Sequence, residues 1–333
     1  MKKRYYLIGL AVFVTLIVGY HFLAASQAEE QIDKAIQEQS EKSKGISVQY
    51  SSIEVSPFSA TVSIRDLTLI LGNHIERAQH LQLDMSYLDF LNIYFGGLTY
   101  GLNNLTTANL TLLRPSYVNR SGLQELKADS LYLSYKGKAL DGLLSAVNGT
   151  TFGHAHSIEA RSSNLTISLP NTSLTKLVAE EFRYSGSIDA QKKHFWFNGT
   201  HQFGMDSLTW TPSESFQNSY SFFIKGFGYP TGAIPFRSAQ LHVNPASQDD
   251  MIRIESTLNS ELGLLSGSGF IEPKTPLGSS KLQKTKVSLT RLSGSLTNVL
   301  ENIERLFSIS LPKTDKGISI QIEGTLSNPS IVR

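Results

Sequence analysis

The stretch "AQHLQLDMSYLDFLN", residues 78–92, changes the spacing of its apolar residues halfway along. From Leu81 to Met85 the apolar residues alternate with polar ones, which is the period of a strand with one buried face. From Tyr87 to Leu91 they fall at spacings of three and four, as on the turns of a helix. The stretch therefore predicts a strand that runs directly into a short helix.

Alternation of the same kind continues through most of the chain from Gly45 onward, with turn signals such as Asn148-Gly149 and Pro245 between many of the runs. This pattern predicts roughly fourteen strands. The clearest runs are 48–55, 62–71, 110–112, 131–135, 165–169, 195–197, 222–224, 241–243, 252–254, 287–289 and 318–322. Helical spacing is found at 87–91, 140–147 and 296–307.

No change in composition divides residues 45–333. We therefore expect this region to form one domain that is mainly β, an elongated, antiparallel and curved sheet with a few short helices. Unlike a compact sandwich, such a sheet can stay open along one side and present a groove.

The segment 5–25, "YYLIGLAVFVTLIVGYHFLAA", carries no charged residue. As a helix it would rise about 31 Å, enough to cross the hydrocarbon core of a bilayer. Basic residues fill positions 2–4 and two glutamates follow the segment, so the positive-inside rule predicts a cytoplasmic basic tip (1–4), a single transmembrane anchor (5–25) and export of the rest. A cleaved signal peptide is the alternative, because Ser26-Gln27-Ala28 is a small-x-small site, although the apolar run exceeds the usual core of about 7–15 residues.

Residues 26–44 are polar except for a few positions, of which Ala28, Ile32 and Ile36 recur every four residues. This spacing predicts a juxtamembrane helix or linker with one thin apolar stripe. A coiled-coil dimer is an alternative use of the stripe.

The composition excludes several classes of partner and site. The 333 residues carry a net charge of +2, of which the basic residues at positions 2–4 supply +3, so the remainder sums to 2 − 3 = −1. We expect no nucleic-acid partner, since binding one needs clustered Lys and Arg. The absence of cysteine excludes disulfides and thiolate metal sites.

The sequence holds no Gly-x-Ser-x-Gly, no His-Glu-x-x-His and no phosphate-binding loop. His154 and His156 share one strand face, but two ligands are too few for a metal site, and we expect a solvated strand end there. Asp249-Asp250 is expected in a polar turn, and Trp196 and Trp210 in cross-strand aromatic pairs or in a site for an apolar ligand or sugar. We therefore expect no enzyme, no cofactor and no metal.

Three groups of residues follow one another in a distinctive order. The first is Val48, Tyr50, Pro57 and Phe58; the second is Ala78, Leu81, Leu83, Leu88, Leu91, Gly97, Leu105, Leu110 and Pro115; the third is Gly324, Thr325, Leu326 and Pro329. Together with the N-terminal span, they resemble the AsmA-like family of bacterial envelope proteins, which is related to TamB and more distantly to the bridge-like lipid transfer proteins. The DUF945 group, with a similar anchor and β-rich exterior, is the competing resemblance.

The resemblance implies a single-pass protein of the bacterial inner membrane, with its β domain in the periplasm and no catalytic residues. Members of the family form a groove of inward-pointing apolar side chains, in which acyl chains are thought to lie. Phospholipid or fatty acyl chains and envelope proteins are therefore the implied partners, in lipid transport or outer-membrane assembly.

The implied groove also assigns positions in this chain. The helix at 87–91 would cap the sheet and bury Leu88 and Leu91 against its apolar face. The candidate groove residues are Leu67, Leu69, Leu81, Leu83, Leu88, Leu91, Leu110 and Leu112. The alternative is a structural or interaction protein with a closed β core, which recruits protein partners through exposed edge strands.

Overall fold

The computed structural model describes residues 24–34, 36–38, 46–96, 100–101, 104–121, 123–137, 156–170, 172, 175–188, 199–229, 232–246, 251–274 and 276–332. Most of the predicted anchor, residues 5–23, and the predicted helix at 140–147 lie outside these ranges. Within these ranges, no helix is both long and apolar enough to cross a membrane.

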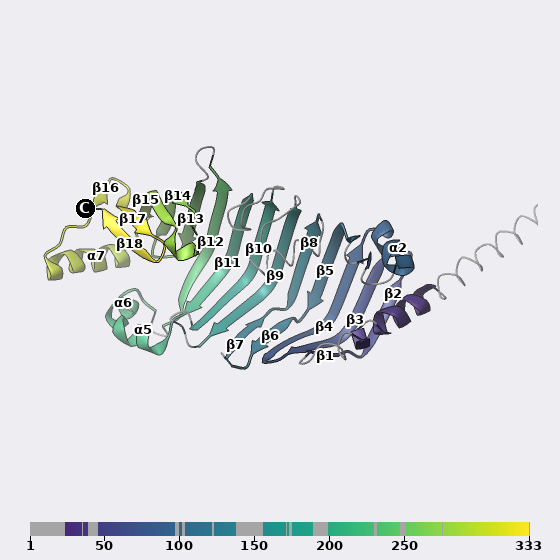
Figure 1. Ribbon diagram of the computed structural model, residues 1–333. Helices are drawn as coiled ribbons and strands as arrows, with labels where there is room; N and C mark the ends of the chain where they lie inside the picture. The colour runs from purple at the N-terminus through teal and green to yellow at the C-terminus, as the bar shows by residue number, and fades with distance from the viewer. Residues whose placement is uncertain are drawn as a thin grey trace, which may run out of the picture.

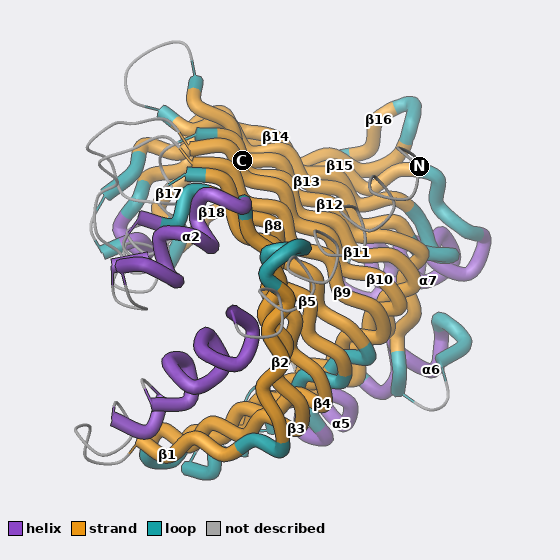
Figure 2. The backbone as a smooth tube through the Cα atoms, turned by 90° about the vertical axis from the view of Figure 1, so that its right-hand side faces the viewer, coloured by secondary structure: helices purple, strands orange, loops and turns teal. Residues whose placement is uncertain are grey.

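The described residues form an 18-stranded antiparallel sheet with a few short helices, which confirms the prediction of a mainly β, antiparallel and curved structure. The sheet is elongated and curves into a trough (Figure 1, Figure 2). The strands are β1 (Ile46–Gln49), β2 (Ser52–Ser56), β3 (Thr61–Leu71), β4 (His74–Met85), β5 (Thr107–Leu113), β6 (Ser116–Asn119), β7 (Gln124–Lys127), β8 (Ser130–Lys136), β9 (His156–Leu169), β10 (Thr175–Ile188), β11 (Thr200–Thr211), β12 (Ile234–Pro245), β13 (Ile252–Asn259), β14 (Leu264–Glu272), β15 (Lys281–Thr290), β16 (Lys313–Thr314), β17 (Gly317–Thr325) and β18 (Asn328–Val332). The helices are α2 (Tyr87–Gly96), α5 (Glu214–Ser219), α6 (Ser221–Gly226), α7 (Gly294–Phe307) and the 3-10 helix η2 (Leu277–Ser279). Residues 24–34 and 36–38 are also helical and are called the N-terminal helix below.

Most strands pair with the strands that precede and follow them in the sequence. The departures arise where one long strand is interrupted. Thus β3 pairs with both β1 and β2, β4 with both β5 and β6, and β9 with both β7 and β8. The break between β5 and β6 falls at Arg114-Pro115, where proline has no N–H to donate to the ladder. The result is mostly a meander of hairpins with local connections; the exception is the pair of β15 and β17, whose connection contains α7 and β16.

The predicted helices at 87–91 and 296–307 are confirmed as α2 and α7. α7 begins after Ser293, whose Oγ accepts a hydrogen bond from the backbone N–H of Leu296 at 3.2 Å, and it ends at Ser308 in the left-handed conformation. The stripe of residues 26–44 is helical where it is described, and the side chains of Ala28 and Ile32 on it are buried.

The prediction of a strand at 222–224 is wrong, because these residues lie in α6. The preceding helix α5 begins after Ser213, whose Oγ accepts from the backbone N–H of Phe216. The aromatic rings of Phe216 and Tyr220 pack against each other at a tilt of 37°, with centroids 4.6 Å apart, and the N–H of Ile224 donates to the carbonyl of Tyr220. Phe216, Tyr220 and Ile224 are thus spaced by four, a helical stripe that outweighs the two-residue spacing of the apolar residues within 222–224.

Candidate functional site

One face of the sheet carries two continuous rows of mostly apolar side chains. Residues directly opposite each other in an antiparallel pair share a face, so the strand register defines each row. Row A, from β2 to β17, is Val55, Val62, Leu83, Leu110, Leu133, Ala160, Tyr184, Phe203, Leu241, Ser256, Gly267, Val287 and Ile320. Row B, beside it, is Ile53, Ile64, Leu81, Leu112, Leu131, Ser162, Phe182, Met205, Ala239, Leu258, Leu265, Leu289 and Ile318.

The opposite face is polar at the positions between the two rows. On β9 and β10 these positions are Arg161 and Arg183, which are in register with each other. Arg183 forms an ion pair with Asp206 of β11, and its Nε lies 3.6 Å from a carboxylate oxygen of Glu181. These side chains are about half exposed, so the pairs add little stability. The sheet is therefore amphipathic, with charge on one side and hydrocarbon on the other.

The apolar rows line the hollow side of the trough. The N-terminal helix and α2 both lie on that side (Figure 2), and both pack against row residues of β2, β3 and β4. Farther along the sheet, the row side chains on β5 and β8 are only half-buried: Leu110, Leu112, Leu131 and Leu133. The hollow side therefore keeps part of its apolar surface accessible beyond β4.

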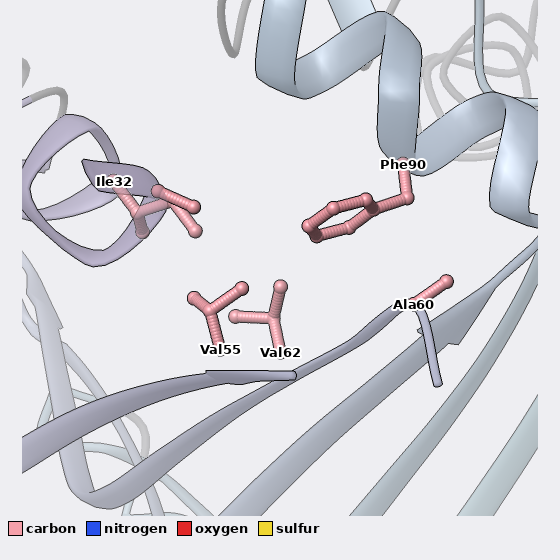
Figure 3. Packing of buried hydrophobic residues seen from close by; sticks show 6 residues of the cluster. Ile32, Val55, Ala60, Val62 and Phe90 are labelled. Carbon is pink, nitrogen blue, oxygen red and sulfur yellow. The ribbon is translucent and has the colours of Figure 1, made fainter. Parts of the chain in front are cut away.

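A tight apolar cluster occupies the β2 end of the trough. Ile32 of the N-terminal helix, Val55 and Val62 of row A, Ala60 and Phe90 of α2 converge there (Figure 3). A cavity of about 170 Å³ lies between the N-terminal helix, α2 and the sheet. Its wall also includes Leu81 and Leu83, which belong to rows B and A.

A buried carboxylate holds α2 over the sheet. Asp89 is only 3% exposed, and its carboxylate accepts hydrogen bonds from the hydroxyls of Ser86, at 2.7 Å, and Thr106, at 3.0 Å. In return, the Oγ of Ser86 accepts from the backbone N–H of Asp89 at 3.1 Å, which caps the start of the helix. The backbone N–H groups of Thr106 and Thr107 also point at Asp89, each at 3.4 Å. One side chain therefore ties the end of β4, the start of α2 and the start of β5 together.

The structure separates the predicted groove residues into groups. Leu81, Leu83, Leu110 and Leu112 lie together in rows A and B. Leu67 and Leu69 are half-buried on β3 and lie beyond Asp66, whose φ is 51°. Their partners on β4 are Ala78 and Glu76, which belong to neither row.

The expected packing of Leu88 is wrong, because its side chain is 73% exposed. Leu91 is half-buried, and the side chains of α2 that are buried are Asp89, Phe90 and Ile93. The anchoring of Asp89 rotates the helix so that Phe90 and Ile93, three residues apart, face the cavity. The spacing of these two residues was a usable signal in the sequence.

Two buried histidines, at the starts of β9 and β11, pair with tyrosine hydroxyls. His156 is buried and hydrogen-bonded to the hydroxyl of Tyr135, so the expectation of a solvated strand end is wrong for this residue. The Nδ1 of His201, also buried, lies 2.9 Å from the hydroxyl of Tyr184. Burial raises the pKa of the Tyr184 hydroxyl above its ordinary value.

The other candidates add no site. Among the described residues, no group of three or more His, Cys, Asp or Glu side chains could hold a metal ion. Trp210 packs against Phe216 of α5, with ring centroids 5.3 Å apart. His154, Trp196 and Asp249-Asp250 lie outside the described residues.

Row B contains one polar side chain whose change has a testable effect. Ser162 is 4% exposed, and its hydroxyl has no hydrogen-bond partner among the described residues. We expect Ser162→Ala to raise the free energy of unfolding by about 1 kcal/mol, because a buried unsatisfied hydroxyl carries a desolvation cost. Urea unfolding of the purified protein measures this. Ser163→Ala is the matched control on the polar face, and its hydroxyl lies 2.7 Å from that of Ser130, so its loss should lower stability.

Comparisons with known proteins identify no family for the chain. No family model matches it, and no curated protein matches it. Among solved structures, it matches the crystal structure of LptH, the LptA homologous periplasmic component of the conserved lipopolysaccharide transport device from Pseudomonas aeruginosa. That match has a TM-score of 0.24 and 10% sequence identity, and it covers 46% of this chain and 82% of that chain. Agreement at this level supports no functional argument. The function proposed below therefore rests on the geometry of the trough.

Proposed function

We propose that the hollow face of the sheet binds the acyl chains of lipids, in a membrane-anchored envelope protein of the AsmA-like type. The observation that carries this proposal is the pair of rows, which keeps a mostly apolar lining in register across the strands from β2 to β17. A sheet whose only task was to form a closed core would have its apolar face covered. Here the row residues of β5 and β8 remain half-buried.

The energetics suit a carrier rather than a permanent binder. Each methylene that leaves water for an apolar surface contributes about 0.8 kcal/mol. Eight or nine such groups would contribute about 7 kcal/mol, which corresponds to a dissociation constant of about 10 μM. Thirteen strands spaced at about 4.8 Å give rows roughly 58 Å long, longer than a single membrane acyl chain, so a bound chain has room to shift along the trough.

The anchor and the location complete the proposal. In this proposal the uncharged segment 5–25 is the anchor in the bacterial inner membrane, and the basic residues before it favour export of the trough to the periplasm. Phospholipid or fatty acyl chains are its ligands, and no catalytic step is required of it. Shielding hydrocarbon from water is the mechanism, in lipid transport or outer-membrane assembly.

Photocrosslinking in living bacteria tests this function with the full chain. A photoreactive benzoylphenylalanine at Leu133 of row A is expected to capture lipid, which mass spectrometry of the purified adduct identifies. The matched control is the same group at Tyr132, the neighbouring residue on the polar face of β8, which is already aromatic and exposed. Equal lipid capture at the two positions, or none at Leu133, contradicts the proposal.

A second function is favoured by the edge of the sheet. All five residues of β18 are exposed, and Ile331 is 63% exposed. Such an edge suits a protein that recruits partners by strand addition. Capture of a discrete protein by the photoreactive group at Ile331, with no lipid captured at Leu133, would favour this function instead.

A further inference from the structure

The cavity under the N-terminal helix is unusual for a protein core. Interiors are close-packed, and voids larger than a water molecule are few. This cavity of about 170 Å³ is lined by the apolar side chains of three elements, among them Ile32, Leu81 and Phe90. An apolar cavity of about 150 Å³ stays dry and binds a ligand of the size of benzene. The space is therefore large enough for a short stretch of hydrocarbon.

The N-terminal helix forms the roof of the cavity. It is held by polar contacts at its sides as well as by its apolar stripe. A carboxylate oxygen of Glu29 accepts from the backbone N–H of Val55 at 3.0 Å. The hydroxyl of Tyr94 donates to the amide oxygen of Gln27 at 2.8 Å, and the hydroxyl of Tyr50 donates to Asp33. The N-terminal helix is thus fixed to β2, to α2 and to the residue that follows β1. These tethers keep the roof in place above a space that its own side chains do not fill.

The floor of the cavity is the beginning of the two rows. Ile64 and Leu81 belong to row B, and Val62 and Leu83 to row A. On the next strand, β5, the rows continue with Leu110 and Leu112, which are half-buried. A chain lying along the rows toward β2 would therefore pass from the open trough into the roofed cavity and end there.

We propose that this cavity is a terminal subsite that receives the methyl end of a lipid acyl chain, with the N-terminal helix as its fixed roof. The inference rests on the proposed function, because it assumes that an acyl chain lies along the rows. Hydrocarbon is the occupant that the site fits, since the cavity is apolar and the row that leads to it is apolar. The polar headgroup would then lie farther along the trough, on the side of β8 and β9.

Two photoreactive fatty acids distinguish this arrangement in bacteria that make the full chain. One carries a diazirine at its methyl end and the other carries a diazirine near its carboxyl group, and cells incorporate both into phospholipids. We expect the methyl-end probe to modify peptides that contain Ile32 or Phe90. The carboxyl-end probe is expected to modify β8 to β10 instead. Peptide mass spectrometry locates the adducts.

Filling the cavity from opposite walls tests whether it is the subsite. Ala28→Leu fills it from the roof and Leu81→Phe from the floor. Each methylene kept out of the cavity lowers its occupancy about fourfold, so excluding two should lower methyl-end adducts there about 15-fold. Leu113→Phe is the matched control: it makes the same change at an exposed residue of β5 on the opposite face of the sheet, and it should leave these adducts unchanged.

The outcomes separate the inference from the function on which it rests. Methyl-end adducts that lie along β5 to β12 and never at the cavity would overturn the subsite while leaving lipid binding intact. The subsite would also be overturned if the peptides that contain Ile32 or Phe90 were still fully modified in both filling variants. Adducts nowhere on the hollow face would overturn lipid binding itself.

Discussion

Leu110→Asp is expected to lower lipid capture by the trough about 100-fold. Leu110 lies in row A on β5, between Leu83 and Leu133, where an acyl chain would lie directly against it. A carboxylate covered by hydrocarbon loses its water without gaining a partner, and a cost of about 3 kcal/mol corresponds to about 100-fold weaker binding. In the unliganded protein the carboxylate at this half-buried position keeps part of its hydration. The substitution should therefore lower the free energy of unfolding by less than it weakens lipid binding.

The measurement uses the photoreactive group at Leu133 in the Leu110→Asp background, with lipid adducts counted per molecule of protein. Thr111→Asp is the matched control, because Thr111 is the next residue of β5 and faces the polar side, opposite Tyr132. Limited proteolysis of both variants reports whether the sheet is intact. Undiminished lipid capture in a folded Leu110→Asp protein would show that the row does not contact the lipid.

Asp89→Ala is expected to lower the free energy of unfolding by about 3 kcal/mol. The change removes the charged acceptor of the hydroxyls of Ser86 and Thr106 and of the backbone N–H groups of Thr106 and Thr107, and hydrogen bonds to a charged group contribute about 1.5–3 kcal/mol each. The Oγ of Ser86 can still accept from the backbone N–H of residue 89, but the carboxylate no longer orients that hydroxyl at the start of α2. Asp89→Asn should cost less than half as much, because its amide oxygen still accepts. Urea unfolding of the purified protein gives both values.

The control for this change is Asp315→Ala, in the exposed turn between β16 and β17. It should alter the free energy of unfolding by no more than about 0.5 kcal/mol. If Asp89→Ala changed the free energy of unfolding as little as this control does, the carboxylate would not be what holds α2 to the sheet. In that case the apolar contacts of Phe90 and Ile93 would account for the position of the helix.

The spacing of apolar residues was sufficient to predict much of the architecture. Alternation predicted most of the strands, and the change of period after Met85 predicted α2 at its correct start. These features are local, since a strand or a helix imposes its period on the residues that form it. The failure at 222–224 has the same origin, because two apolar residues two positions apart fit either structure, and only the packing of Phe216 and Tyr220 selects the helix.

The candidate site depends on contacts that the spacing does not encode. Leu81 and Leu83 could be placed on an apolar face from the sequence, but the alignment of that face across thirteen strands is set by register, which joins residues far apart in the chain. The orientation of α2, which exposes Leu88 and buries Phe90, follows from the bond of Asp89 to Thr106, 17 positions away. The cavity likewise exists only where the N-terminal helix meets α2 over the sheet. Periodicity is a property of neighbouring residues, whereas a trough and its closed end are made by long-range pairing, and only the folded chain brings those partners together.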